Sequence, residues 1–142
     1  MNKMKTKEKV ARKIKNMQGY VDFLKDQPAD EEELVKNYLL KSAIERNLQL
    51  AIESALDIGE VIISSFNLEK PEDYRSIIII LGKEGIIPEK FAIRFSDAAK
   101  LRNILVHMYT EVDPAVISQI LENNLDDFDE YARYIARYLD RK

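Results

Sequence analysis

The amino-acid sequence predicts an all-α protein: a single domain over residues 1–142, built as an antiparallel bundle of about five helices. Only four glycines and four prolines punctuate the 142 residues, and they fall where helices would begin or end. Between them, apolar residues recur in steps of three and four, which is the spacing of one buried helix face. The connections are a few residues long and so favour antiparallel neighbours. A chain of this length fits one domain.

A short break at Pro28 separates the first two predicted helices. The first spans about residues 3–26. The second begins after Asp30, which we interpret as an N-cap that forms a capping pair with Glu33. No helix breaker follows before the 64–69 region, so the second helix is predicted to be long and continuous. The apolar face of the first helix consists of Val10, Ile14, Met17, Val21 and Leu24.

The third helix is predicted to start near Pro71, a residue that suits the first turn of a helix, and to end at 82–85. Its run Ile77–Leu81 is also compatible with a strand, because periodicity alone cannot assign a short β-branched run. The helical context on both sides favours a helix.

Two further helices complete the predicted bundle. The fourth opens at Pro88 and extends to about Thr110. The fifth begins where Asp113, a good N-cap, is followed by Pro114, a good first-turn residue, and it continues to about Leu139.

Charge is distributed unevenly along the chain. The net charge is −3, yet residues 1–15 hold seven basic residues and one acid, a local balance of +6, so the remaining residues carry −9. Such a basic helix start can contact phosphates locally. The simpler interpretation is a solvated helix end, since charge runs on helices are usually exposed faces.

Composition excludes several classes of protein. No segment approaches the roughly 18 consecutive apolar residues of a membrane span, and the basic start lacks the apolar region of a secretory signal. We therefore expect a cytoplasmic protein with no membrane partner. The chain has no cysteine, which excludes disulfides and thiolate metal sites. A single histidine, with no acids at ligand spacing around it, predicts no metal site, and no motif predicts a cofactor.

The stretch RNILVHMY, residues 102–109, contains that single histidine. At about 100° per residue on a continuous helix, Tyr109 lies about 20° to one side of Arg102, while Asn103 and His107 lie about 100° and 140° to the other. The four polar side chains would thus share one arc. The core-facing side of the same helix would consist of Leu101, Ile104, Leu105 and Met108.

This set of side chains suits phosphate chemistry. Arg102 can supply a permanent, planar donor pair for a phosphate and for the charge that builds on it during transfer. His107 is the side chain type best placed to exchange a proton near pH 7, and Asn103 can orient its ring. Together they could cleave RNA without a metal ion. Since cleavage benefits from both an acid and a base, one histidine per chain suggests a two-fold dimer with two such helices in one cleft.

Plainer interpretations remain open for each of these residues. Arg102 could be a surface ion-pairing residue, His107 a boundary histidine, and Tyr109 a packing residue. Glu53 and Asp57 belong to a four-residue ladder of polar residues on the second helix, most simply a solvated stripe. The functional alternative is that Glu53 or Asp57 reaches the cleft of Arg102 and supports it.

RNILVHMY resembles the R-x4-H-x-Y signature of the HepT-like toxins, within the HEPN superfamily of all-α domains. The motif is complete in Arg102, His107 and Tyr109, and Asn103 fits the polar residue usual after the arginine. The stretch SAIERNLQLAIESALDIGEVII, residues 42–63, resembles the long second helix of this family, and residues 111–113 resemble the connection after the motif. The resemblance covers most of residues 5–140.

The resemblance implies a homodimeric, metal-independent ribonuclease that acts as the toxin of a type VII toxin–antitoxin pair. Its partner would be a nucleotidyltransferase antitoxin of the MNT type, and its substrate RNA. In the family the antitoxin transfers AMP from ATP to the motif tyrosine, here Tyr109, and the added phosphate and base would block Arg102. The alternative is a noncatalytic module that binds a nucleotide or the nucleotidyltransferase through the same face.

Overall fold

The computed structural model describes residues 3–107 and 112–142, and in these residues it contains eight α-helices. The all-α prediction is confirmed for this part of the chain, and the predicted number of about five helices is wrong. The helices are α1 (Lys3–Lys25), α2 (Glu31–Lys36), α3 (Tyr38–Ser65), α4 (Tyr74–Lys83), α5 (Glu89–Phe95), α6 (Asp97–Leu105), α7 (Pro114–Asn123) and α8 (Asp126–Asp140).

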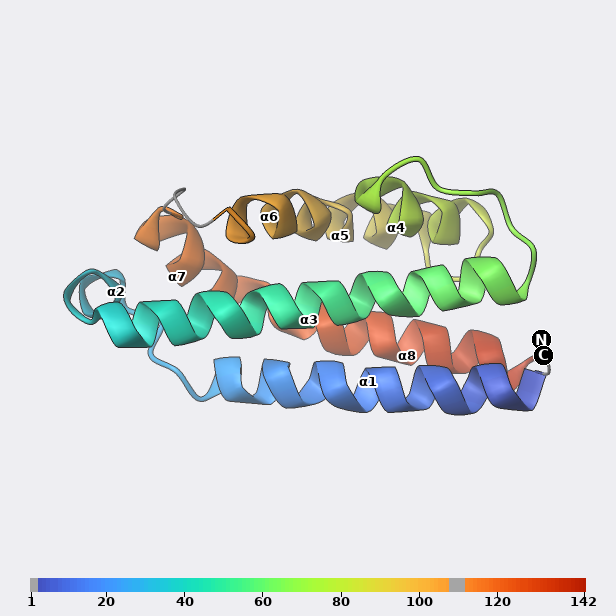
Figure 1. Cartoon of the computed structure of the whole chain (residues 1–142), viewed down its shortest axis with the longest axis horizontal. Helices are drawn as coiled ribbons and strands as arrows, with labels where there is room; N and C mark the ends of the chain where they lie inside the picture. Colours follow the sequence, from blue (N-terminus) through green and yellow to red (C-terminus); the bar gives the residue numbers. More distant parts are fainter. Residues whose placement is uncertain (1–2, 108–111) are drawn as a thin grey trace.

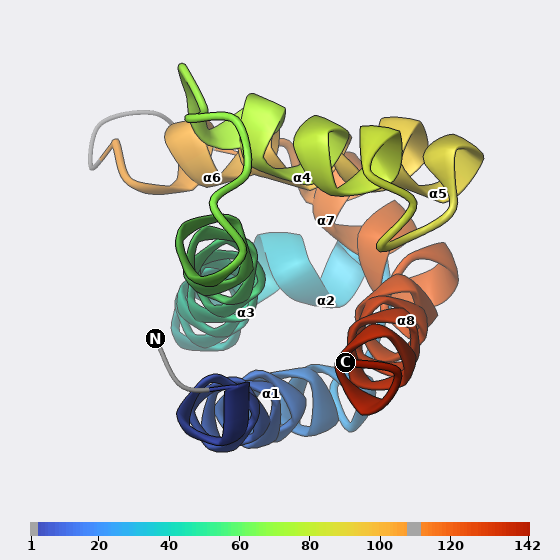
Figure 2. The same cartoon turned by 90° about the vertical axis from the view of Figure 1, so that its right-hand side faces the viewer.

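The helices pack around the long helix α3. Figure 1 shows α1 and α8 running along one side of α3, with the shorter helices α4, α5 and α6 on the other side. Seen end-on in Figure 2, α1 and the α4–α6 group lie at opposite edges, and α3 and α8 lie between them. The short helices α2 and α7 pack together at the end of the molecule away from the two termini.

The excess of helices has one cause: three predicted helices are each broken in two by polar residues. The break after α2 lies at Asn37, whose φ and ψ of −113° and 93° are extended and whose Oδ1 accepts a hydrogen bond from the Leu40 N–H at 3.0 Å. Asparagine is a preferred N-cap, so one residue both ends α2 and starts α3.

The other two breaks lie at Ser96, between α5 and α6, and at Asn124, between α7 and α8. The Ser96 hydroxyl is buried and donates to the Ile93 carbonyl at 2.7 Å, a bond that competes with regular helix geometry. The prediction missed these breaks because it relied on glycine and proline as the signals of helix ends.

Helix starts were easier to predict than internal breaks. Asp30 and Asp113 are the N-caps of α2 and α7, as predicted. The predicted capping pair of Asp30 with Glu33 is wrong, because the Asp30 carboxylate accepts from the Glu32 N–H at 2.9 Å. The predicted start of the third helix at Pro71 is wrong, because α4 is instead capped by Asp73, which exchanges capping-box hydrogen bonds with Ser76. The run 77–81 lies inside α4, so its strand alternative is also wrong.

A glycine allows α4 to approach α3 closely. A Cβ atom on Gly59 would lie 2.5 Å from Cγ2 of Ile77, which is far inside van der Waals contact. Beside it, the buried Tyr131 hydroxyl donates to the Ala55 carbonyl at 2.7 Å. Burial also raises the pKa of Tyr131, so this phenol stays protonated. Gly59 therefore fixes the distance between α3 and the first turn of α4.

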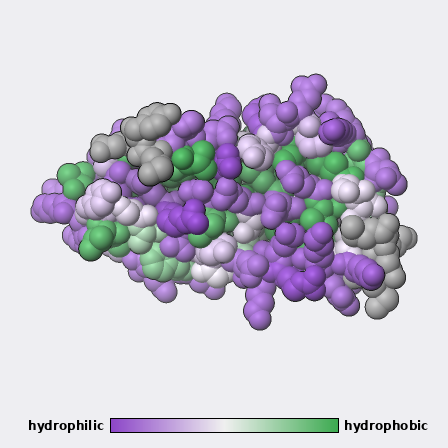
Figure 3. Space-filling model, in the orientation of Figure 1, coloured by the Kyte–Doolittle hydropathy of each residue, from purple (hydrophilic) through white to green (hydrophobic). Residues whose placement is uncertain are grey.

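The basic start of the chain lies on α1, and two of its lysines are ion-paired. Lys7 pairs with Asp140 of α8 at 2.6 Å, and Lys13 pairs with Asp57 of α3 at 3.2 Å. Across the described residues, none of the helices combines the length and the apolar character needed to cross a membrane. Figure 3 shows hydrophobic residues at the surface where α2 meets α3, and Val35, Tyr38 and Leu39 are exposed there.

Candidate active site around Arg102

The motif stretch lies at the C-terminal end of α6, and only its first part is helical. Arg102 and Asn103 lie in the last turn of α6, whereas His107 follows the helix and has an exposed side chain. Tyr109, the fourth residue of the predicted polar arc, lies outside the described residues. Because the arc assumed a continuous helix, it does not describe the position of His107.

The predicted extension of this helix to Thr110 is therefore wrong at Val106 and His107. The His107 N–H donates to the Ile104 carbonyl, three residues back, at 3.2 Å, so the last turn tightens as the helix ends. Residues 106–110, VHMYT, include only one strong helix former, the methionine. Local propensity thus gives little support for continuing the helix.

Glu53 of α3 holds the guanidinium of Arg102. The Nε and Nη2 atoms of Arg102 both donate to Oε2 of Glu53, at 3.3 and 3.2 Å. The side chains of Arg102 and Glu53 are 21% and 34% exposed, so the pair is partly shielded from water. This contact joins two helices across 49 positions of the sequence and ties the arginine to α3.

Tyr74, the first residue of α4, supplies a second contact. The Cζ atom of Arg102 lies 4.5 Å from the centroid of the Tyr74 ring, which is a cation–π geometry. No local pattern in the sequence marks this residue, since the contact depends on how α4 and α6 pack together. Glu53 and Tyr74 together fix the direction of the guanidinium. We call Arg102 with Glu53, Tyr74 and its neighbour Asn103 the arginine clamp.

Asn103 contributes the remaining contact of the arginine clamp. The Nη1 atom of Arg102 donates to the Asn103 Oδ1 at 3.4 Å, so the amide oxygen faces the arginine. A guanidinium has five N–H groups, and three of them are used by Glu53 and Asn103. Among contacts with the described residues, one N–H on each Nη atom remains available, and such a pair suits two oxygens of a phosphate.

Asp57, the other acid proposed to reach this cleft, points elsewhere. Its carboxylate accepts from Lys13 of α1 at 3.2 Å, one helical turn along α3 from Glu53. In residues 3–107 and 112–142, no three acidic or histidine side chains gather in a group that could hold a metal ion.

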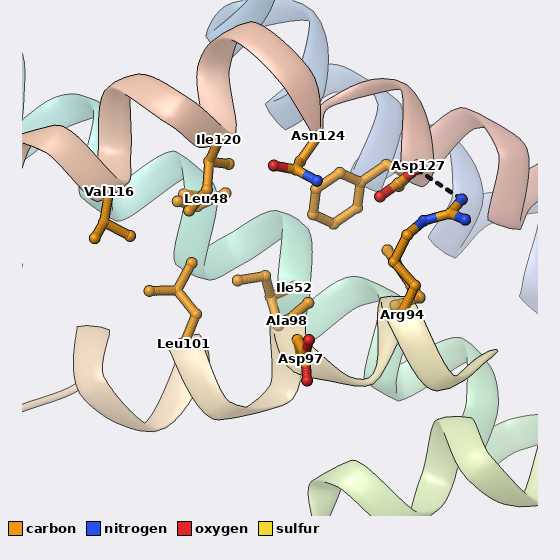
Figure 4. Close-up of a pocket in the computed structure, with 12 residues that line it drawn as sticks. Leu48, Ile52, Arg94, Asp97, Ala98, Leu101, Val116, Ile120, Asn124 and Asp127 are labelled. Atoms are coloured by element: carbon orange, nitrogen blue, oxygen red, sulfur yellow. Dashed lines mark hydrogen bonds and ion pairs between the residues drawn. The ribbon is translucent and has the colours of Figure 1, made fainter. Parts of the chain in front are cut away.

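The opposite side of α6 faces an apolar pocket of about 240 Å³ between α3, α7 and α8. In Figure 4, Leu101 points into this pocket toward Val116 and Ile120 of α7. Leu101 and Leu105 pack against the core, as the predicted apolar face requires. Ile104 does not, because it is 42% exposed. The end of α6 is therefore anchored to the core by Leu101 and Leu105, while Arg102 and Ile104 lie on sides of the helix that do not face this pocket.

Comparisons with known proteins place this site in context. The family model described as "Ribonuclease HepT-like" matches residues 8–135. The tRNA nuclease HepT of Aphanizomenon flos-aquae is 30% identical over 121 residues, which cover 84% of this chain and 82% of the relative. The mRNA nuclease HepT of Shewanella oneidensis is 23% identical over 131 residues, or 92% of this chain and 91% of the relative.

The fold is also found in a solved complex. The tri-AMPylated HEPN toxin of Shewanella oneidensis, in complex with an MNT antitoxin, superposes with a TM-score of 0.71 at 23% identity. The superposition covers 96% of this chain and 99% of that one. At this level of identity, the likeness establishes a common fold.

Proposed function

The chain belongs to the ribonuclease HepT-like family, and from that premise we propose that it is the ribonuclease toxin of a toxin–antitoxin pair. Family membership makes ribonuclease the enzyme class of the chain. The proposal treats residues 1–142 as one catalytic domain that acts on RNA in the cytoplasm.

The observation that carries the proposal is the arginine clamp. Arg102 would bind the scissile phosphate through its two remaining N–H groups and stabilise the charge of the pentacoordinate phosphorus. His107 would take the proton from the ribose 2′-hydroxyl as the 2′-oxygen bonds to phosphorus, or would give a proton to the 5′-oxygen as its bond breaks. Asn103 and Glu53 would hold the guanidinium in place. No step requires a metal ion or a cofactor.

We propose that the active enzyme is a homodimer. Each chain has one histidine, so a separate acid and base require two copies of the α6 end in one cleft. The exposed Ile104, two residues after Arg102, supports α6 as part of that interface, because a second copy would remove this apolar side chain from water.

Regulation by an MNT-type nucleotidyltransferase is part of the same proposal. The related Shewanella toxin is AMPylated and bound to an MNT antitoxin. Tyr109 is the motif tyrosine here and follows Arg102 by seven positions. An adenylyl group on Tyr109 would add a negative phosphate that competes with RNA for Arg102.

The test is RNA cleavage by protein expressed without its partner, in the presence of EDTA. We expect the wild type to cleave RNA and to leave 2′,3′-cyclic phosphate ends, and we expect Arg102→Ala and His107→Ala to keep the helical circular dichroism spectrum and lose cleavage. A wild type that cleaves no RNA would favour the noncatalytic module. With the nucleotidyltransferase and ATP, the intact mass should rise in steps of one AMP, and Tyr109→Phe should abolish the increase.

A further inference from the structure

A polar groove adjoins the arginine clamp, between the start of α4 and α6. It has a volume of about 650 Å³, within the usual range of roughly 300–1,000 Å³ for small-molecule sites. Its walls include Tyr74 and Arg75 of α4, Lys100 and Asn103 of α6, and Glu60 of α3. The groove therefore has room for a nucleotide-sized group.

Two residues belong to both the groove and the arginine clamp. The Tyr74 ring lies 4.5 Å from the Arg102 Cζ atom, and the Asn103 Oδ1 lies 3.4 Å from its Nη1 atom. A phosphate bound to the remaining N–H groups of Arg102 would thus lie near two residues that line the groove. Whatever is covalently attached to that phosphate can extend into it.

The charges in the groove disfavour a second phosphate. Glu60, Glu72 and Asp73 oppose Arg75 and Lys100, which gives a balance of −1. A neutral group that carries both N–H donors and ring or carbonyl acceptors matches such mixed walls better than an anion does.

Tyr74 adds an aromatic surface to this mixed lining. The residue remains 38% exposed even though Arg102 lies against its ring. A planar heterocycle can stack on such a ring, and stacking of a nucleobase on an aromatic side chain contributes about 1–3 kcal/mol. The start of α4 is held by the capping box of Asp73 and Ser76, so the ring is attached to a fixed piece of backbone.

We propose that this groove binds the nucleobase of the nucleotide whose 3′-phosphate is held by Arg102, with Tyr74 as the stacking surface. The inference rests on the proposed function for the presence of RNA, and it adds a base-binding subsite to it. Tyr74 then has two roles, since it positions Arg102 and contacts the base.

The experiment measures binding rather than cleavage, with the four nucleoside 3′-monophosphates and inorganic phosphate as probes, by NMR titration of the purified full chain. We expect at least one nucleotide to bind roughly 5- to 150-fold more tightly than phosphate, which is the stacking energy expressed as a ratio. The amide signals of Ala99 and Lys100 should shift with that nucleotide and not with phosphate alone.

Variants of Tyr74 separate its two roles. Tyr74→Phe keeps the ring and should keep the nucleotide-to-phosphate affinity ratio. Tyr74→Leu should bring the nucleotide-to-phosphate affinity ratio close to one. Loss of arginine positioning alone would instead lower the affinity for nucleotide and for phosphate by the same factor, and would leave the ratio unchanged. Tyr138→Leu is the matched control, because it removes another cation–π ring, the Tyr138 ring of α8 that Lys142 contacts, and should not change the ratio.

Two outcomes would overturn the subsite: equal affinity of the wild type for phosphate and for all four nucleotides, or a ratio that survives Tyr74→Leu. The parallel cleavage assay keeps this result separate from the proposed function. A protein that cleaves RNA without a nucleotide preference loses only the subsite, and one that binds nucleotides without cleaving RNA loses only the catalytic role.

Discussion

Two arginines on consecutive helices, Arg94 of α5 and Arg102 of α6, have similar contacts in different surroundings. Arg94 pairs with Asp127 at 3.2 Å and with Glu130 at 3.7 Å, and its Cζ atom lies 5.1 Å from the Phe91 ring. Among residues 3–107 and 112–142, Arg102 has one carboxylate partner, Glu53, and it has a closer ring, Tyr74.

Exposure and local charge distinguish the two sites. The Arg94 side chain is 53% exposed and is outnumbered by two acids, so its site repels a further anion. Arg102 is more buried, and within the described part of the chain it is matched by one acid; Tyr74 and Asn103, which contact it, also line a groove. A salt bridge and an aromatic contact alone therefore do not mark an anion site. The number of opposing charges separates the two sites, since Arg94 also lines a pocket.

The largest expected effect comes from removing the two arginines in turn. Arg102→Ala should lower RNA cleavage by roughly 10²–10³-fold, the usual loss of one donor to transition-state charge. Arg94→Ala should leave the cleavage rate within about twofold, because surface ion pairs contribute little. Initial rates on one RNA substrate test this pair. Equal losses in both variants would mean that the arginine clamp has no catalytic role.

The acidic partners give the next contrast. Glu53→Ala frees the Arg102 guanidinium, and we expect kcat to fall by roughly 10- to 100-fold through misplacement of the donor, with little change in KM. Asp127→Ala is the matched control, since Arg94 keeps Glu130 and lies away from the proposed chemistry. If Glu53→Ala instead raised kcat, Glu53 would be an inhibitory partner of Arg102 rather than a support.

Glycines test whether helix spacing supports the arginine clamp. Gly59→Ala forces α4 away from α3 at Ile77, so the free energy of unfolding should fall by about 1–3 kcal/mol. Cleavage should also fall, because Tyr74 moves with α4. Gly19→Ala on α1 meets no atom within 4 Å and should stabilise the fold by about 0.5–1 kcal/mol. Urea denaturation measures both, and a neutral Gly59→Ala would contradict the close approach.

The smallest effect concerns the ion pair of Arg94 with Asp127. Asp127→Asn should lower the free energy of unfolding by less than about 1 kcal/mol, because the pair is partly exposed to solvent. Screening at about 1 M salt should remove most of that difference. Denaturation of wild type and variant at low and high salt gives the comparison. A difference that persists at high salt would point to packing rather than charge.

Local signals in the sequence predicted some features well. Helix class and the caps at Asp30 and Asp113 follow from spacing and from side chains that bond the next few N–H groups. The breaks at Asn37 and Ser96 did not follow, since a polar residue inside an apolar pattern is common in continuous helices. Only the packing of the folded chain shows which of them end a helix.

The residues of the candidate site also fall into two groups: those that the sequence predicts and those that only the packing of the helices shows. Arg102, Asn103, His107 and Tyr109 stand close together in the sequence, and the ladder on the second helix offers either Glu53 or Asp57 as the acid that reaches the cleft of Arg102. Tyr74 was missed, because its contact arises only where α4 packs beside α6. Asp57 was named with Glu53 but lies against Lys13, one helical turn away, so spacing on a helix could not decide which acid faces Arg102.

The ion pair of Arg102 with Glu53 also bears on how fast RNA would be captured. The pair carries no net charge, and the chain as a whole carries −3. On the proposed function, long-range attraction to a polyanion would be weak, and the association rate constant would fall near the unsteered range of about 10⁵–10⁶ M⁻¹s⁻¹. Selection among RNAs would then occur after contact, through dissociation rates.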